Sequence, residues 1–364
     1  MTLPIPDVTP GPGVEFFVTF SARTADERPG LPKGHEIAWD QIAIPVPAGA
    51  WTTVDAASMP PLNVEETPAS IAITGGDFSV VFDRATGTIG SWRYRSAEMV
   101  RTGPVPYFWR VPTDNDLGNK MPERLAVWRE AGDKRSVGSV NLARTGPAQV
   151  EVTVRGAVAA GDSPFTTRYT VYGSGDLVVD HTMYPGQDGL PELPRFGMRL
   201  TLPAAFQTMT WFGRGPHESY ADRKTSAAVG RYASTVADQY HPHIRPQEHG
   251  NKTDVRWVAL TNSAGLGLLA AGLPLVSVAA SHYVPEEYDR GRGEGQLRTV
   301  DMKRRDLVHL TIDLGQMGVG GDTSWGARTH AEYTLPARPY TLRYRLRPFS
   351  ADAESPDALA RQRF

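Results

Sequence analysis

The chain contains no cysteine among its 364 residues, which excludes disulfide bonds and thiolate metal sites. The N-terminus lacks the basic start and apolar run of a secretion signal, and no stretch reaches the roughly 20 apolar residues of a membrane-spanning helix. Neither sign of charge is in excess. The formal net charge of −2 gives no reason to expect nucleic acid or an anionic membrane as a partner. These absences predict a cytoplasmic protein with a neutral partner.

A regular alternation of strand and helix patterns is also lacking, which argues against a (β/α)₈ barrel. Instead, short segments with alternating apolar residues are separated by turn residues. Residues 78–82 and 88–94, joined by Asp83-Arg84-Ala85-Thr86-Gly87, are typical of a β-hairpin. The same pattern predicts further strands at 150–154, 167–172, 177–183, 195–200, 256–260, 307–313 and 340–346. We therefore predict an all-β fold, a large antiparallel domain with one short helix near residues 122–131.

The two ends of the chain differ from this domain. Residues 14–20 and 37–44 show strand alternation, but so few strands are not stable alone, so they must pack on the rest of the chain or on strands supplied from elsewhere. Pro60-Pro61 precede the expected boundary. The sequence thus predicts an N-terminal region of residues 1–64, a β-domain of residues 65–350 and a flexible tail of residues 351–364.

One glycine-rich loop ends in a large aromatic side chain. Gly318, Gly320 and Gly321 allow backbone conformations that are closed to other residues, and Trp325 follows them. The indole offers a flat apolar face and one N–H donor, which suits the C–H-rich face of a sugar. The pattern fits equally well a ring that closes a sheet edge.

Polar residues gather in two other loops, at residues 211–223 and 245–251. If these loops met on one sheet face, a set of four side chains could act as general acid and base in proton transfer on a sugar: His217, Glu218, Glu248 and His282. Ion pairs of Arg214 and Arg245 with those carboxylates would instead order the loops without any chemistry.

Two patterns resemble metal sites. Asp114 and Asp116 could supply oxygen ligands to a hard cation, but such residues also hydrogen-bond their own backbone and fix the shape of a loop before a helix. His241 and His243 have a spacing that serves zinc, yet no third ligand follows at a clear spacing. We therefore expect no metal or other cofactor in this chain.

Six segments occur together in one order and carry a family resemblance: residues 34–41, 82–87, 108–116, 211–220, 245–248 and 318–325. They are similar to the C-terminal region of the large bacterial β-galactosidases of glycoside hydrolase family 2, including the small subunit found where that enzyme is split in two. His249 and Val111 depart from the residues that the family leads us to expect, asparagine and alanine. The resemblance implies a galactose-mutarotase-like β-sandwich for residues 65–350, preceded by the trailing strands of an incomplete immunoglobulin-like domain.

The resemblance also implies where catalysis takes place. Retaining enzymes of this family use two glutamates about 5 Å apart. In the similar enzymes these glutamates, and a divalent cation, lie in an upstream barrel that we do not find here. The resemblance therefore implies a non-catalytic portion, inactive alone, that works with a barrel-bearing large subunit or upstream segment. The assembled oligomer would hydrolyse terminal β-D-galactosides such as lactose.

Three residues are the implied substrate contacts. Trp325 matches the tryptophan that stacks on the aglycone sugar, and Asp322 lies three residues before it. Gly118 begins a stretch that matches a mobile loop over the pocket and here runs only to Glu123. Two other readings stay open. One is a free-standing carbohydrate-binding or aldose-epimerase-like module that uses the four acid and base candidates, and the other is a structural domain for oligomerisation.

Overall fold

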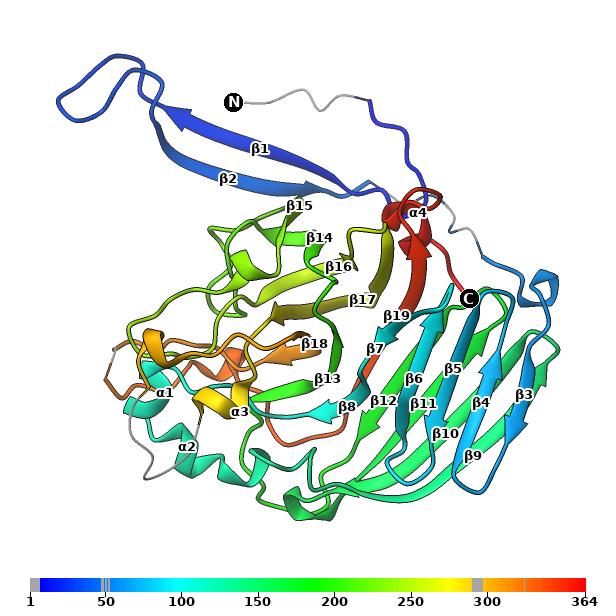
Figure 1. The fold of residues 1–364 in the computed structure, drawn as a ribbon. Coiled ribbons are helices and arrows are strands. Elements are labelled where there is room, and N and C mark those ends of the chain that lie inside the picture. The colour runs from blue at the N-terminus through cyan, green and yellow to red at the C-terminus, as the bar shows by residue number, and fades with distance from the viewer. Residues whose placement is uncertain (1–6, 47–48, 50, 52, 290–296, 324) are drawn as a thin grey trace. The chain divides into compact units, whose positions relative to one another are not determined.

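The computed structural model describes residues 7–46, 49, 51, 53–289, 297–323 and 325–364. They divide into two compact units, the smaller within residues 1–55 and 357–364 and the larger within residues 56–356. In the smaller unit, β1 (Phe16–Arg23) and β2 (Glu36–Ile44) form an antiparallel hairpin, where strands were predicted (Figure 1). The part predicted as a flexible tail contains the short helix α4 (Pro356–Ala360). The immunoglobulin-like identity of residues 1–64 stays a prediction.

One sheet of the larger unit has five strands in sequential order, each antiparallel to the next. Its inner face is apolar because Phe78, Val80 and Phe82 alternate with partly exposed residues along one strand. The strands are β3 (Asn63–Glu66), β4 (Ser70–Thr74), β5 (Phe78–Asp83), β6 (Thr88–Tyr94) and β7 (Ala97–Val100).

The second sheet has twelve strands, whose longest path runs β15-β14-β16-β17-β19-β12-β11-β10-β9, while β18, β13 and β8 branch from β17. All pairings between its named strands are antiparallel. The strands are β8 (Thr102–Tyr107), β9 (Ser136–Gly146), β10 (Gln149–Val158), β11 (Ser163–Tyr172), β12 (Leu177–Met183), β13 (Arg195–Pro203), β14 (Thr208–Gly215), β15 (Ala228–Thr235), β16 (Lys252–Thr261), β17 (Leu266–Ser281), β18 (Leu307–Gln316) and β19 (Tyr340–Ser350).

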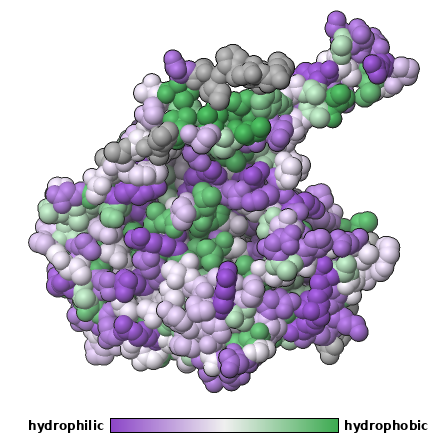
Figure 2. All heavy atoms as spheres, turned by 180° about the vertical axis from the view of Figure 1, so that it is seen from behind, coloured by the Kyte–Doolittle hydropathy of each residue, from purple (hydrophilic) through white to green (hydrophobic). Residues whose placement is uncertain are grey.

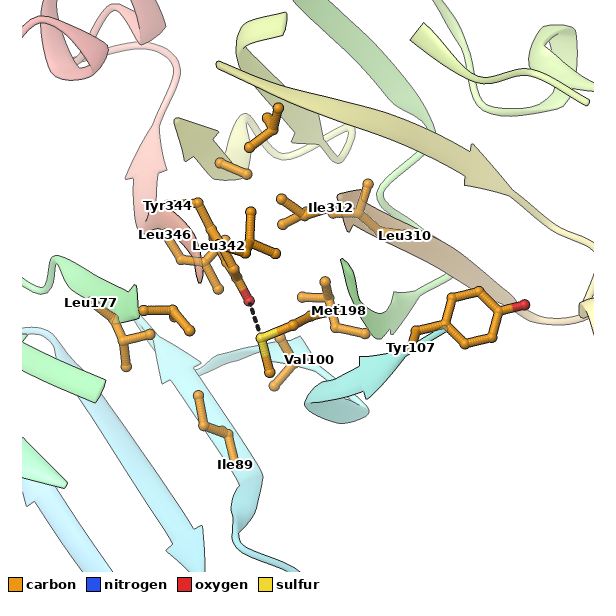
Figure 3. Packing of buried hydrophobic residues seen from close by; sticks show 14 of the residues in the cluster. Ile89, Val100, Tyr107, Leu177, Met198, Leu310, Ile312, Leu342, Tyr344 and Leu346 are labelled. Carbon is orange, nitrogen blue, oxygen red and sulfur yellow. Dashed lines mark hydrogen bonds between the residues drawn. The ribbon is translucent and has the colours of Figure 1, made fainter. Parts of the chain in front are cut away.

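The hydrophobic core lies between the two sheets. Phe82 of β5 packs against Tyr169 of β11 with ring centroids 5.1 Å apart. Near the middle, the Tyr344 hydroxyl donates to the Met198 sulfur at 3.3 Å, and apolar side chains of both sheets surround the pair (Figure 3). The predicted all-β sandwich is thus confirmed.

The reverse face of the molecule is mostly hydrophilic, with hydrophobic residues gathered in patches (Figure 2).

The helices are few and short. The helix predicted at residues 122–131 is wrong in extent, because the chain forms only α2 (Met121–Arg124) and one 3₁₀ turn (Ala126–Trp128) there. Residues expected to shape a loop form α1 (Asp114–Gly118), capped by Thr113. A further helix, α3, covers Pro285–Tyr288. No helix among the described residues is long and apolar enough to cross a membrane.

Candidate functional site

A buried ion pair supports the glycine-rich loop that leads to Trp325. Arg110 follows β8 and has no exposed surface, and Asp116 of α1 is 1% exposed. The guanidinium donates to both Asp116 carboxylate oxygens, at 2.8 and 3.1 Å. It also donates to the carbonyl oxygens of Met317 and, at 2.9 Å, Gly318. Because each charge is satisfied by its partner and by backbone, the pair can stay buried and fix the start of the loop.

The middle of the loop is held by a carboxylate and an amide. Asp222 accepts from the backbone N–H groups of Val319, at 3.0 Å, and Gly320, at 2.8 Å. The Asn115 side chain donates to the Val319 carbonyl at 3.0 Å. A Cβ atom on Gly318 would lie 2.7 Å from the Asp222 carboxyl carbon, so this close approach requires glycine. These hydrogen bonds therefore fix the backbone at the base of the loop, at Val319 and Gly320.

Trp325 is an exposed residue at the end of this loop. The residue is 78% exposed, so the interpretation of a ring that closes a sheet edge is wrong. Its backbone packs on the end of α1, where a Cβ atom on Gly118 would lie 2.9 Å from the Trp325 carbonyl carbon. The structure thus brings together Gly118 and Trp325, two of the three residues predicted as substrate contacts. Ser324 lies outside the described residues.

Asp322, the third predicted contact, is also exposed. Its Oδ1 atom lies 2.8 Å from the Nε2 atom of His330. This hydrogen bond and the Asp322 charge raise the pKa of His330 above its ordinary value. The pair places a carboxylate and an imidazole on the same loop as the Trp325 ring, where both can exchange hydrogen bonds with a hydroxylated ligand.

The first two of the four predicted acid and base residues have local partners. His217 is exposed and lies 3.0 Å from the Ser226 hydroxyl through Nε2. Glu218 accepts from the Gly250 N–H at 2.9 Å and pairs with Arg223 at 2.5 Å. Burial alone raises the pKa of Glu218, but these two donors outweigh it and hold the pKa below its ordinary value. Glu218 therefore stays ionised near neutral pH, and its hydrogen bonds order the loop after Gly215.

Glu248 lines a small cavity. It accepts from the backbone N–H of Val111 at 3.1 Å, from Gln316 at 3.3 Å, and from the buried Arg195, which the sequence analysis did not single out. The cavity also contacts His249 and has a volume of about 20 Å³. That volume has room for one water molecule and excludes a sugar.

His282 points to other partners. Its Nδ1 atom lies 2.7 Å from the Leu307 carbonyl oxygen and its Nε2 atom 3.1 Å from the Arg304 guanidinium. Since the carbonyl only accepts and the guanidinium only donates, the ring is neutral, and burial lowers its pKa. Each of the four candidates thus has its own partners, and none of these contacts joins the four residues in one catalytic group.

The remaining sequence patterns are structural. Asp116 pairs with Arg110, while Asp114 accepts from the Gln247 side-chain amide at 3.0 Å. His241 and His243 stack edge to face, with centroids 4.4 Å apart. Within the described ranges, no group of three or more His, Cys, Asp or Glu residues could hold a metal ion. Arg214 pairs with Asp254 at 2.5 Å, a different carboxylate from the two predicted.

The fold and the loop define an all-β sandwich protein that exposes Trp325 on a loop whose base is held by hydrogen bonds. The family model described as β-galactosidase small chain matches residues 74–346, and the model for β-galactosidase domain 4 matches residues 1–45. The chain therefore belongs to the β-galactosidase small-chain family, as the six segments predicted.

Curated relatives support this membership. A protein from Priestia megaterium named β-galactosidase is 39% identical over 338 residues, which are 92% of this chain and 32% of that protein. A β-galactosidase of Streptococcus thermophilus is 30% identical over 94% of this chain and 34% of that protein. The chain thus spans about a third of the length of these relatives.

Among solved structures, the galactose 1-epimerase of Lactobacillus acidophilus covers 80% of this chain and 99% of its own, with a TM-score of 0.46 and 9% identity. A likeness this distant carries no argument about function.

Proposed function

We propose that this chain is the non-catalytic C-terminal part, or small subunit, of a β-galactosidase that hydrolyses terminal β-D-galactosides such as lactose. In this proposal the chain completes the active-site pocket, and Trp325 stacks on the aglycone sugar. The observation that carries the proposal is the exposure of Trp325, 78%, on a loop whose base is held by Arg110, Asp116 and Asp222. A rigid, exposed aromatic face suits a sugar ring.

The proposal assigns the chemical step to another part of the assembled enzyme. All pairings between named strands of the described residues are antiparallel, whereas a (β/α)₈ barrel needs eight parallel strands. The two glutamates of a retaining mechanism, and the divalent cation expected with them, would come from a barrel-bearing partner or segment. The cytoplasm remains the expected location, and an oligomer the expected assembly.

Substitution of Trp325 tests the pocket role. The experiment uses a chimera of the Priestia megaterium relative in which this chain replaces the matching region. Loss of an aromatic contact of ~1 kcal/mol should raise the KM for lactose about fivefold in Trp325→Ala and leave kcat nearly unchanged. Tyr184→Ala is the matched control, because Tyr184 is also an exposed aromatic residue of the larger unit. Unchanged kinetics in Trp325→Ala would contradict the stacking role.

The alternative of an aldose-epimerase-like module has less support. Proton transfer requires a sugar within hydrogen-bonding reach of the acid and base. The cavity beside Glu248 is too small for a sugar, and His282 is occupied by the Leu307 carbonyl and Arg304. Polarimetric mutarotation of galactose that is catalysed by the chain and lost in Glu248→Gln would restore this alternative.

A further inference from the structure

A pocket of about 450 Å³ lies between α2 and the segment that follows Trp325. This volume is within the range of small-ligand sites. The residues that line the pocket come from three parts of the chain: Asn119 and Arg124, residues 190–192, and Met317 with Arg328, Thr329, Ala331, Thr334, Pro336 and Ala337. Asn119 belongs to the predicted loop of residues 118–123, whereas Trp325, Asp322 and the four acid and base candidates do not line the pocket.

The walls of the pocket are joined by backbone hydrogen bonds. The Leu193 N–H donates to the Leu335 carbonyl at 2.7 Å, and the Gly318 N–H donates to the Tyr333 carbonyl at 2.8 Å. Arg124 links two parts of the lining by donating to Glu192 at 2.6 Å and to the Asn119 side chain at 3.0 Å. The pocket is therefore formed before any ligand arrives, which lowers the entropic cost of binding.

The polar groups of the pocket include a negatively charged hydrogen-bond acceptor, Glu192, and two positively charged donors, Arg124 and Arg328. Glu192 uses one carboxylate oxygen for Arg124, and the other can accept from a ligand hydroxyl. Burial raises the pKa of Glu192, but the hydrogen bond from Arg124 and the nearby Arg328 outweigh it, so this carboxylate stays ionised. Arg328 donates no hydrogen bond to any residue that the structure describes, and its guanidinium is free to donate to a ligand.

We propose that this pocket binds a neutral monosaccharide through Glu192 and Arg328. Arg124 already pairs with Glu192, so Arg328 leaves the pocket with a net positive charge, which disfavours a cation. A hydroxyl group can accept from Arg328 and also donate to the second Glu192 oxygen, whereas a carboxylate or phosphate anion cannot donate. Leu190, Pro191 and Pro336 offer apolar surface to the C–H groups of a sugar ring. The inference does not rest on the proposed function, because it concerns binding by the 364-residue chain alone. It assigns a sugar site to residues that are separate from the Trp325 ring.

The site lies close in the chain to the tryptophan loop. Arg328 follows Trp325 by three residues, and Asn119 follows Gly118, which packs on the Trp325 backbone. A ligand in the pocket would therefore restrain the chain next to Gly118 and the chain next to Trp325, the two sides of the contact between α1 and this loop.

Titration of the full chain with D-galactose and with D-glucose, followed by calorimetry and saturation-transfer NMR, tests the proposal. Arg328→Ala should weaken binding about tenfold through the loss of a charge-assisted hydrogen bond. Ala331→Phe should abolish binding by filling the pocket. Arg155→Ala, at an exposed arginine on β10, should bind as the unchanged chain does. Circular dichroism melting checks that each variant folds. If Ala331→Phe does not fold, Arg328→Ala alone tests the proposal.

Three results would overturn the proposal. The first is that neither sugar binds. The second is that binding is lost in Trp325→Ala and retained in Ala331→Phe, which would place the sugar on the tryptophan ring and leave the proposed function intact. The third is that sodium acetate binds through Arg328 while both sugars do not, which would make the pocket an anion site.

Discussion

The exposed Trp325 ring depends on two of the most deeply buried charged residues of the larger unit. Arg110 and Asp116 lie beneath its loop and neutralise each other, so the chain keeps a charged pair in its interior in order to hold two backbone carbonyl groups in place. Such pairs are costly to break, because the remaining charge stays buried without a partner.

Removal of Asp116 should therefore destabilise the protein strongly. We expect Asp116→Ala to lower the free energy of unfolding by about 3–5 kcal/mol, measured by urea denaturation. The control is Asp306→Ala, which breaks the exposed ion pair with Arg101, where the two side chains are 84% and 47% exposed. That change should cost less than about 1 kcal/mol. Equal losses in both variants would contradict the structural role of the buried pair.

Asp313 makes stability depend on pH. Its carboxyl is fully buried, 3.4 Å from the Arg195 guanidinium, and burial raises its pKa from 3.8 to about 7. An acid whose pKa is higher in the folded state favours folding at low pH. This contribution is complete below pH 3.8 and is lost as the pH rises through about 7.

Asp313→Asn should remove this pH dependence. We expect the decrease in the free energy of unfolding between pH 5 and pH 8 to be smaller in the variant, by on the order of a few kcal/mol. Buried His309 has the opposite effect, since burial lowers its pKa to about 3 and stability is lost as the pH falls below 6.5. Asp77→Asn, at an exposed carboxylate, serves as the control. Identical pH profiles of Asp313→Asn and the unchanged chain would contradict the assignment.

At the scale of elements, alternation identified the strands that bury one face. Residues 177–183 were predicted as a strand and form β12 with those bounds, because Leu177, Val179 and Met183 alternate inward. β17 was not predicted, because its sequence LGLLAAGLPLVSVAAS shows no alternation. This strand pairs with β16, β18 and β19 and is covered on both faces, so small apolar residues replace the alternating pattern.

The candidate site was partly predictable. Trp325 follows from a glycine-rich motif that is local in sequence, and Gly118 follows from the family resemblance; the structure places them in contact. The supporting role of Asp222 was not foreseen, since its hydrogen bonds to Val319 and Gly320 span nearly a hundred residues. Long-range pairing of this kind leaves no spacing signal in one sequence. For the same reason, proximity of the four acid and base candidates was assumed rather than derived.

The contact between α1 and the tryptophan loop gives a test at this scale. In Gly118→Ala, the added Cβ atom would lie 2.9 Å from the Trp325 carbonyl carbon, so the loop must move. We expect kcat/KM of the chimera for lactose to fall about tenfold, because small displacements of binding groups are costly. Gly315→Ala, where a Cβ atom meets nothing within 4 Å, should behave like the unchanged chimera. An unaffected Gly118→Ala would mean that the loop position does not matter for turnover.

At the scale of the whole molecule, the chain is a member of the β-galactosidase small-chain family that spans about a third of its curated relatives. Its two units match two successive family models, domain 4 and the small chain. All pairings between the named strands of the described residues are antiparallel. The proposed function assigns the shaping of the pocket and sugar binding to this chain, and assigns the chemical step to a barrel elsewhere.

The most direct measurement is hydrolysis of lactose and of nitrophenyl β-D-galactoside by the purified chain, alone and after mixing with the part of the Priestia megaterium relative that this chain does not match. We predict no turnover by the chain alone, none by the partial relative alone, and turnover by the mixture. Robust hydrolysis by the 364-residue chain alone would contradict the central claim that its role is non-catalytic.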